Sequence, residues 1–390
     1  MRKAFFSLLV AVSLTACGGS GSAGLDGSGI SGNFISTTVE VERRFLYSLN
    51  REEGSVSGFL VVSEDEGGHD HAHGQILAQH DHEPSGEGGE VLELQELDSS
   101  PYTFGGAAPI DMVVDGEGRN LFLLEASGEL RANSIDGLTG LLTVGEAQAT
   151  NVANPRFLRL SDSGDAMAVL GDSLAIFAID ENGLLSPAAV LDGTQSWTDV
   201  RLQEDRGVGA TQTGAVGFLW QVGAPLDLGP EIALPGGRRG QIAYAQAGVF
   251  VVNGEDASVT RLSQNQQGSL ALIATFALPE ELTDPQALTA LFDGEDLLVG
   301  DSDSVVLLHP REDGLEEEGH ADLDQSPTVL FAVPESAFVL AGHADGEGYH
   351  LLEVGEEGLA VLGEYETEHA GVSAFGFAER FQRVTETVSL

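Results

Sequence analysis

Short apolar segments alternate with polar turns along most of the chain, and the same order of segments recurs. Each copy holds an apolar strand, a turn rich in Gly and Asp, a second strand that often ends in Ile-Asp, and a Gly-Leu turn. The copies cover residues 109–143, 155–186, 197–222, 242–272, 287–317 and 330–361. Because no apolar stripe with helical spacing exceeds two turns, the pattern predicts an all-β fold built from repeats.

The repeat period indicates how the strands are grouped. The second strands of the copies follow one another at nearly even intervals and centre near Phe122, Met167, Gly209, Phe250, Leu298 and Phe338. Their spacing matches the period of about 40–50 residues that is typical of the four-stranded antiparallel blades of β-propellers. A β-sandwich or a solenoid would also be rich in strands, but the regular period and the lack of capping helices favour the propeller.

A seventh copy begins at residues 43–62, but it lies too far from the next one. The interval from Leu46 to Phe122 is much longer than the period, and removing residues 64–90 restores it. This stretch is therefore expected to be an insertion between the outer strands of the first blade. The C-terminal segment 371–377 is expected to supply the missing inner strand and close the ring, because an open ring leaves exposed strand edges. We predict a seven-bladed propeller over residues 36–390.

The clearest copy also resembles a known family. The pattern D-x-x-G-R-x-L followed by I-D-x-x-T-G-x-L, within residues 109–142, is similar to the seven-bladed lactonase-like propellers, which include the 6-phosphogluconolactonase-type enzymes. The resemblance implies the same fold over most of the chain. Its motif consists of turns and strand pairing, so it identifies a blade and not a reaction.

The N-terminus predicts export and lipidation. Arg2 and Lys3 precede the apolar stretch 4–14, which is too short to span a membrane as a mature helix. Residues 14–17, Leu-Thr-Ala-Cys, resemble the lipobox of bacterial lipoproteins, and Cys17 is the single cysteine of the chain. The resemblance implies a signal peptide at 1–16, a lipid on Cys17, a flexible Gly/Ser tether at 17–35 and membrane attachment through the lipid. The alternative is an ordinary signal peptide with an incidental cysteine.

The charge balance excludes several partners. Without residues 1–16 the chain has 15 arginines, no lysine and 62 acidic residues, a formal net charge of −47. This charge argues against DNA, RNA or anionic lipid as partners, which bind basic surfaces. With 42% hydrophobic residues the chain is globular, and we expect a monomer in the cell envelope of a bacterium from a saline habitat. Gly18 follows the cysteine, which favours the outer membrane.

The insertion holds half of the histidines of the chain. His69, His71, His73, His80 and His82 lie close together in the sequence, with Asp70, Asp81 and Glu83 among them. In an extended chain, side chains at i and i+2 share one face about 6.6 Å apart, so His-x-His pairs can chelate one ion. The stretch therefore predicts a site for Zn²⁺, with Cu²⁺ or Ni²⁺ as alternatives. A solvated loop that chelates metals weakly is the other interpretation.

The insertion is similar to the His/Asp-rich loop of periplasmic zinc metallochaperone propellers, which deliver zinc to the binding protein of an ABC transporter. This resemblance implies a metal transporter component, or another envelope protein, as a partner. Those proteins also use histidines from other blades, whereas the blade starts at 107–114 and 153–160 contain none. The match therefore covers the loop alone.

Catalytic candidates are few. A lactonase would need an acid/base group and cationic groups at the propeller mouth, and the candidates are Arg156, Arg159, Arg201, Arg238, Arg239, His309 and His343. We expect the two histidines to be structural or surface residues. The sequence Gly-Asp-Ser-Leu at 171–174 is expected to be a turn, and Asp pairs such as 162/165, 293/296 and 301/303 either form turns or bind Ca²⁺. We therefore expect a binding protein, with a lactonase-like hydrolase or a protein-interaction scaffold as the alternatives.

Overall fold

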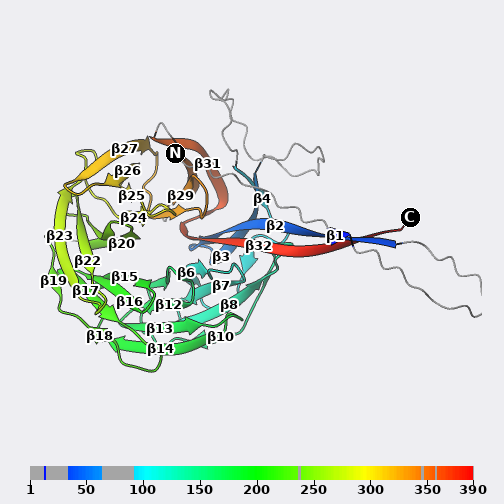
Figure 1. Cartoon of the computed structure of the whole chain (residues 1–390), viewed down its shortest axis with the longest axis horizontal. Helices are drawn as coiled ribbons and strands as arrows, with labels where there is room; N and C mark the ends of the chain where they lie inside the picture. The colour runs from blue at the N-terminus through cyan, green and yellow to red at the C-terminus, as the bar shows by residue number, and fades with distance from the viewer. Residues whose placement is uncertain are drawn as a thin grey trace, which may run out of the picture.

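The chain forms a ring of seven antiparallel sheets, the blades of a β-propeller (Figure 1). The computed structural model describes residues 13–14, 34–63, 92–235, 239–343, 347–355 and 358–389. These residues form strands and turns without a helix, so none of them belongs to a helix that could cross a membrane. The predicted all-β, seven-bladed architecture is confirmed.

The strands are given blade by blade, with the innermost strand first. Blade 1 comprises β32 (Val372–Ser389), β2 (Phe34–Asn50), β3 (Ser55–Ser63) and β4 (Leu92–Glu96), with short additions from β1 (Ser13–Leu14) and β5 (Tyr102–Thr103). Blade 2 comprises β6 (Pro109–Val114), β7 (Asn120–Glu125), β8 (Glu129–Ile135) and β10 (Ala147–Ala149), with β9 (Leu142–Thr143) beside β8. Blade 3 comprises β11 (Phe157–Leu160), β12 (Ala166–Leu170), β13 (Ser173–Ile179) and β14 (Leu185–Asp192).

The remaining four blades follow the same order. Blade 4 comprises β15 (Trp197–Gln203), β16 (Arg206–Thr211), β17 (Gly214–Leu219) and β18 (Asp227–Leu228), with β19 (Ile232–Ala233) beside β17. Blade 5 comprises β20 (Arg239–Ala245), β21 (Gly248–Asn253), β22 (Ser258–Gln264) and β23 (Leu270–Ala277). Blade 6 comprises β24 (Ala287–Ala290), β25 (Leu297–Gly300), β26 (Ser304–Pro310) and β27 (Leu315–Asp322). Blade 7 comprises β28 (Val329–Ala332), β29 (Phe338–Gly342), β30 (Glu347–Gly355) and β31 (Gly358–Ala370).

The second strand of each blade is buried on both faces. Every residue of β7, β12, β25 and β29 is buried, because these strands lie in the middle of a sheet that packs between two neighbouring blades. Phe122 of β7, for example, packs in one cluster with Met167 and Val169 of β12 in the next blade. This packing explains why the second strands are continuous apolar runs in the sequence. All six predicted second-strand positions lie in second strands.

The C-terminal strand closes the ring, as the sequence predicts. β32 pairs with β2 from Asn50↔Val372 to Phe34↔Ser389 and provides the inner strand of blade 1. The two strands are 17 and 18 residues long and continue together beyond the ring as a two-stranded ribbon (Figure 1). Of the C-terminal strand, the sequence predicts only the segment 371–377.

The predicted insertion is bounded by the two outer strands of blade 1. Ser63, the last residue of β3, pairs with Leu92, the first residue of β4. Residues 64–91 lie outside the described residues, and so do the proposed metal ligands between His69 and His82. Cys17, the predicted lipidation site, also lies outside them.

Candidate functional site

A cavity of about 1130 Å³ lies at the centre of the ring. Its wall is made largely by the inner strands β6, β11, β28 and β32, with single residues from β15 and β20 and a pair from β24. The turns that follow the inner strands, which carry Glu117, Phe292 and Glu335, form one end of the cavity. Arg51, on the turn between β2 and β3, lies at the other end, because β2 runs antiparallel to the inner strand β32.

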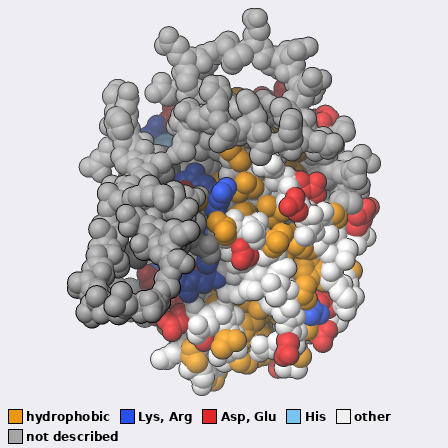
Figure 2. All heavy atoms as spheres, turned by 90° about the vertical axis from the view of Figure 1, so that its right-hand side faces the viewer, with side chains coloured by type: hydrophobic (Ala, Val, Ile, Leu, Met, Phe, Trp, Pro, Cys, Tyr) orange, Lys and Arg blue, Asp and Glu red, His pale blue; other side chains and the backbone are white. Residues whose placement is uncertain are grey.

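Arginines gather at this cavity in an otherwise acidic molecule. Its lining includes Arg51, Arg119, Arg156, Arg159, Arg201 and Arg380. The whole chain has 17 basic residues against 62 acidic ones, so six arginines at one cavity are a strong concentration of guanidinium groups. Five carboxylates line the same cavity and match part of this charge: Asp111, Asp115, Glu117, Glu335 and Glu379. Figure 2 views the ring from its side and shows acidic side chains scattered over this face, with basic side chains in several places among them.

The third residue of each inner strand in blades 2 to 5 carries a polar side chain. These residues are Asp111 in β6, Arg159 in β11, Asp199 in β15 and Gln241 in β20. Adjacent inner strands do not pair with each other, so their backbone N–H groups need other acceptors. Three of the four side chains, those of Asp111, Asp199 and Gln241, supply such acceptors. These four polar residues of blades 2 to 5 are called the inner belt.

The inner belt joins successive blades through hydrogen bonds to the backbone. Asp111 Oδ2 accepts from the Leu158 N–H at 2.7 Å, and Asp199 Oδ2 accepts from the Ile242 N–H at 2.9 Å. Gln241 Oε1 accepts from the Leu288 N–H at 3.3 Å. Each acceptor therefore holds the inner strand of the next blade in register around the cavity.

Arg159 connects the two carboxylates of the belt. Its Nη1 donates to Asp111 Oδ2 and its Nε to Asp199 Oδ1, both at 3.0 Å. Burial raises the pKa of the Asp111 carboxyl, and the neighbouring Arg159 guanidinium opposes this shift. The three side chains form one buried ionic network in which the charge of Arg159 is matched, so Arg159 positions the wall of the cavity.

Arg201 of β15 lines the cavity and makes only a long contact with the carboxylates of the belt. Its Nε donates to the Ile242 carbonyl at 2.9 Å. Its ion-pair contact with Asp199 is long, 3.9 Å from Nε to Oδ2. Burial and the nearby Arg159 charge lower the pKa of Arg201, although a guanidinium remains charged at neutral pH. Its two Nη groups are therefore the donors best suited to an anion in the cavity.

Arg156 adds a second cation beside an aromatic ring. Its Nη2 donates to the carbonyls of Gly171 and Thr194 at 3.1 and 3.3 Å. The guanidinium carbons of Arg156 and Arg159 lie 5.9 and 5.0 Å from the centre of the Phe157 ring. Phe157 also lines the cavity, so this wall combines positive charge with an apolar surface.

Several carboxylates at or beside the cavity are engaged in local contacts. Asp111 and Asp199 are committed to the belt, and Asp115 accepts from the Arg119 N–H and the Asn120 side chain at 2.7 Å each. Glu117 is paired with Arg119 in solvent. Among the described residues that line the cavity there is no histidine. Glu335 and Glu379 also line the cavity; burial raises the pKa of the Glu379 carboxyl, which accepts from Arg44 Nε at 3.2 Å and is the candidate acid/base group of the lining.

The structure brings together some of the predicted catalytic candidates. Arg156, Arg159 and Arg201 meet at the cavity, whereas His309 and His343 lie elsewhere and the side chains of Arg238 and Arg239 are outside the described part. Arg51, Arg119, Arg380 and three of the belt residues are not among the candidates that the sequence predicts. The signal for the belt is a polar residue at the third position of the first strand in consecutive copies.

The other predicted motifs are turns or local contacts. Gly171 and Asp172 form the turn between β12 and β13, where the Gly171 N–H donates to the Ser173 carbonyl, and Ser173 and Leu174 begin β13. The Asp301 carboxylate accepts the N–H groups of Thr283, Asp284 and Ser302, and Asp165 accepts from Ser161 and Ser163. These carboxylates satisfy backbone and hydroxyl groups, which is the ordinary use of Asp in turns.

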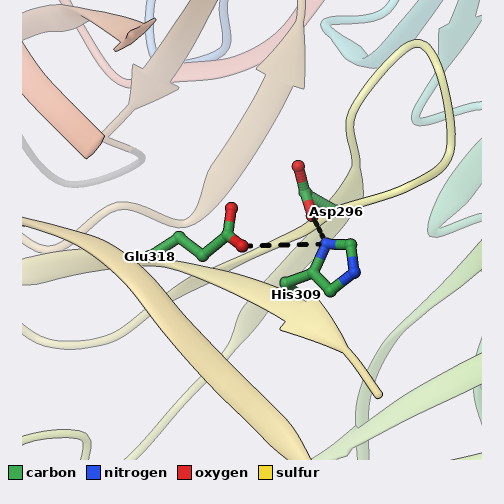
Figure 3. Close-up of side chains that lie close together, drawn as sticks. All are labelled: Asp296, His309 and Glu318. Atoms are coloured by element: carbon green, nitrogen blue, oxygen red, sulfur yellow. Dashed lines mark hydrogen bonds and ion pairs between the residues drawn. The ribbon is translucent and has the colours of Figure 1, made fainter. Parts of the chain in front are cut away.

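Two groups of side chains outside the cavity have donors suited to a metal ion. In blade 6, His309 Nδ1 lies 2.6 Å from Asp296 Oδ1 and 3.9 Å from Glu318 Oε1, and Figure 3 shows both carboxylates directed at this nitrogen. The second group is Asp324, His350 and Glu364. In each group the ligand atoms lie within 4.8 Å of one another.

Solved structures show the same fold. A candidate 6-phosphogluconolactonase from Bacteroides fragilis superposes with a TM-score of 0.65 at 15% identity, covering 86% of this chain and 98% of the other. The periplasmic gluconolactonase of Pseudomonas aeruginosa gives 0.63 at 14% identity, covering 87% and 99%. Virginiamycin B lyase from Staphylococcus aureus gives 0.50 at 13% identity, covering 72% and 95%.

The sequence matches no protein-family model and no curated protein sequence. The structural likeness is shared by proteins with different names and activities, so it defines a fold and leaves the chemistry to the site. The chain is a seven-bladed β-propeller with lactonase-like structural neighbours.

Proposed function

We propose that the propeller is a binding protein of the bacterial envelope whose central cavity takes a small organic anion. The observation that carries the proposal is the group of six arginines at one cavity of a strongly acidic chain. Guanidinium groups bind carboxylates through paired, charge-assisted hydrogen bonds, and Arg201 uses its Nε for the backbone, which leaves its Nη groups for a ligand. A buried cation is costly unless an anion matches it.

The cavity lining also indicates the chemical class of the ligand. Phe157, Phe331, Phe375 and Phe377 line the cavity together with the arginines. Such a wall suits a molecule with a carboxylate at one end and a less polar face, as in an aldonic or uronic acid. With about 1130 Å³, the cavity is slightly larger than the usual range of small-molecule sites, about 300–1,000 Å³.

The direct test is a calorimetric titration of the full-length protein with gluconate, galacturonate and a neutral sugar. The proposal expects binding of at least one acid, weakened by salt because the attraction is electrostatic, and no binding of the neutral sugar. Absence of binding by any organic anion would contradict it.

Lactone hydrolysis is the second candidate, favoured by the neighbour named as a periplasmic gluconolactonase. Opening an aldonolactone yields an aldonate, which is the kind of anion that the arginines would bind. Asp111 and Asp199 accept backbone N–H groups of neighbouring blades and are therefore unsuited to act as acid/base groups, which weighs against this candidate. An assay of glucono-1,5-lactone opening, corrected for the spontaneous rate, distinguishes the two: turnover lost in Arg201→Gln would support a hydrolase.

The envelope location and the metal-binding insertion are proposals that rest on the sequence. Lipid on Cys17 would attach the propeller to the membrane, with the outer membrane favoured. The insertion would add capture of Zn²⁺, Cu²⁺ or Ni²⁺ through the five histidines between His69 and His82, for transfer to an envelope partner such as a metal transporter component. Ser63 of β3 and Leu92 of β4, which flank the insertion, lie near the end of blade 1 where Glu379 of β32 is found. This position follows from the strand pairing, because Val61 of β3 and Glu379 of β32 both pair with Arg44 of β2.

The metal-capture proposal has its own test. A competitive Zn²⁺ titration compares residues 33–390 with the same chain lacking 65–89. Tight binding lost with the deletion supports capture by the insertion, whereas equal binding by both proteins contradicts it.

A further inference from the structure

His350 and His343 form a buried pair on blade 7 that the cavity does not use. Their exposed fractions are 5% and 1%, and their rings meet edge to face with centres 4.9 Å apart. His343 Nε2 lies 2.7 Å from His350 Nδ1. The second ring nitrogen of His343, Nδ1, lies 3.0 Å from the Ser326 carbonyl oxygen. The two imidazoles are therefore links of one hydrogen-bonded chain.

The direction of this chain follows from the carbonyl at its start. A carbonyl oxygen can only accept, so His343 Nδ1 carries a proton and donates it to Ser326. A neutral imidazole that carries its proton on Nδ1 has an unprotonated Nε2, so the 2.7 Å contact with His350 is made with His343 Nε2 as the acceptor. His350 Nδ1 therefore donates to His343, and His350 Nε2 presents a lone pair at the far end of the chain.

That lone pair points at a carboxylate. His350 Nε2 lies 3.2 Å from Asp324 Oδ1, and two acceptors at this distance need a cation between them. Either a proton on His350 or a metal ion can fill the role. Glu364 is directly opposite His350 in the pairing of β30 with β31, and it supplies a second carboxylate. Because all three ligand atoms lie within 4.8 Å of one another, one divalent ion can match both carboxylates at once, which a single proton cannot.

We propose that Asp324, His350 and Glu364 bind a divalent transition-metal ion, with Zn²⁺ the best match. One imidazole nitrogen and two carboxylate oxygens are ligands that Zn²⁺ accepts at about 2.0–2.2 Å. The Asp324 and Glu364 side chains are exposed, so small rotations can close the distances and an ion can enter from solvent. Three protein ligands leave a position open for water or another ligand.

The chain behind His350 is the arrangement that metal-binding histidines use. Such a histidine almost always donates its second ring nitrogen to a fixed acceptor, which sets its tautomer and orientation. Here His343 is that acceptor and is itself held by Ser326. The Gln325 amide donates to Glu364 Oε1 at 3.0 Å and orients this carboxylate. His343 is thus a positioning residue, and none of the three ligands belongs to the histidine-rich insertion of the sequence.

The group at Asp296, His309 and Glu318 provides a matched comparison. It has the same residue types, but both carboxylate contacts of His309 converge on Nδ1, whereas His350 uses one nitrogen for Asp324 and the other for His343. Among the residues that the structure describes, no second histidine is hydrogen-bonded to His309. The group therefore serves as a control for weak binding by a His and two carboxylates.

The test uses the full-length protein with His69, His71, His73, His80 and His82 replaced by alanine, which removes the competing histidines. A titration with Zn²⁺ against a chelator, with Co²⁺ absorption as a second probe, should show one tightly bound ion. Adding Asp324→Asn and Glu364→Gln should weaken binding about 100-fold or more, whereas adding His309→Ala should leave it unchanged. Circular dichroism checks that each variant is folded, which is expected because both substituted carboxylates are exposed.

The role of His343 has a separate readout. His343→Gln should weaken Zn²⁺ binding by about 10–100-fold, the usual effect of losing the residue that orients a metal ligand. A purely structural His343 would change the melting temperature and leave the Zn²⁺ affinity unaltered. The proposal is overturned if the background protein shows no stoichiometric Zn²⁺ binding in the chelator competition, or if the double carboxylate variant binds Zn²⁺ equally well.

Discussion

The Nε of Arg159 donates to Asp199 Oδ1 at 3.0 Å, which joins the inner strand of blade 3 to that of blade 4. The Asp199 side chain is 1% exposed and that of Arg159 is 15% exposed, so the pair is almost removed from water. A buried pair of this kind costs desolvation free energy, and it is kept where both partners satisfy further groups. Here Asp199 also holds the Ile242 N–H of blade 5.

Removing Asp199 should therefore destabilise the whole ring. Asp199→Ala leaves the Arg159 charge partly unmatched and the Ile242 N–H without its acceptor, and breaking a buried pair costs about 3 kcal/mol or more. Urea denaturation followed by fluorescence measures the free energy of unfolding. Asp205→Ala is the control, because the Asp205 side chain is 75% exposed and its contact with Arg206 is 3.9 Å long. A loss for Asp199→Ala no larger than that for Asp205→Ala would show that the belt does not hold the blades.

The turn at Gly140 should tolerate no side chain. Its φ is +70°, and a Cβ there would lie 2.4 Å from Cδ1 of the buried Phe45. Tyr47 also donates to the Gly140 carbonyl at 2.6 Å, so the turn cannot move away without losing this bond. Gly140→Ala should cost about 2–4 kcal/mol, from backbone strain and overpacking together.

Gly193→Ala separates these two causes. Gly193 has a similar φ of +82°, but a Cβ there meets no atom within 4 Å. Only the strain remains, about 1 kcal/mol. Thermal unfolding of both variants gives the comparison, and equal losses would contradict the close packing of Gly140 against Phe45.

The Asp136 turn should make stability depend on pH. Hydrogen bonds from the Thr139 hydroxyl and from the backbone of Thr139 and Leu138 lower the pKa of Asp136. A carboxyl whose pKa is lower in the folded state stabilises the fold above its unfolded pKa of about 4, and this contribution is lost as pH falls through the folded value. Asp136→Asn should lower the melting temperature slightly at pH 7, by an effect that is small because solvent screens the exposed group. The difference in melting temperature between variant and wild type should shrink below pH 4. A constant difference down to pH 3 would show that the ionised Asp136 carboxylate is not its cause.

Ring closure can be tested by shortening the C-terminus. Truncation after Gly371 removes all of β32, the inner strand of blade 1, and leaves the edge of β2 unpaired. We expect this protein to lose cooperative unfolding. Truncation after Gln382 keeps the segment that lies within the ring and should preserve a cooperative transition. Similar melting of the two truncated proteins would contradict closure by β32.

Much of this fold can be predicted from the sequence, and the physical reason lies in residues such as Phe122 and Met167. Second strands are buried on both faces, so they appear as apolar runs that recur with the length of a blade. The length of the β2–β32 ribbon could not be predicted, because pairing between strands at opposite ends of the chain has no local signal.

The cavity could be predicted only in part. Arg159 and Arg201 occur in inner strands of adjacent copies, where the repeat pattern makes them recognisable as cationic candidates. Arg51 and Arg380 come from a turn and from the C-terminal strand, and only closure of the ring brings them to the same cavity. The sequence predicts His343 to be structural or on the surface; it is buried and hydrogen-bonded to His350 of the next strand, a contact that has no local signal in the sequence.

The affinity of the full-length protein for gluconate, compared between wild type, Arg201→Gln and Arg311→Gln, tests the central claim most directly. Arg311 is the matched control, since it is exposed and paired with Glu316 outside the cavity. A charged hydrogen bond contributes about 1.5–3 kcal/mol, so Arg201→Gln should weaken binding roughly 10–100-fold while Arg311→Gln leaves it unchanged. Equal affinities in all three proteins, or no binding of gluconate or any other organic anion, would contradict an anion site in the central cavity.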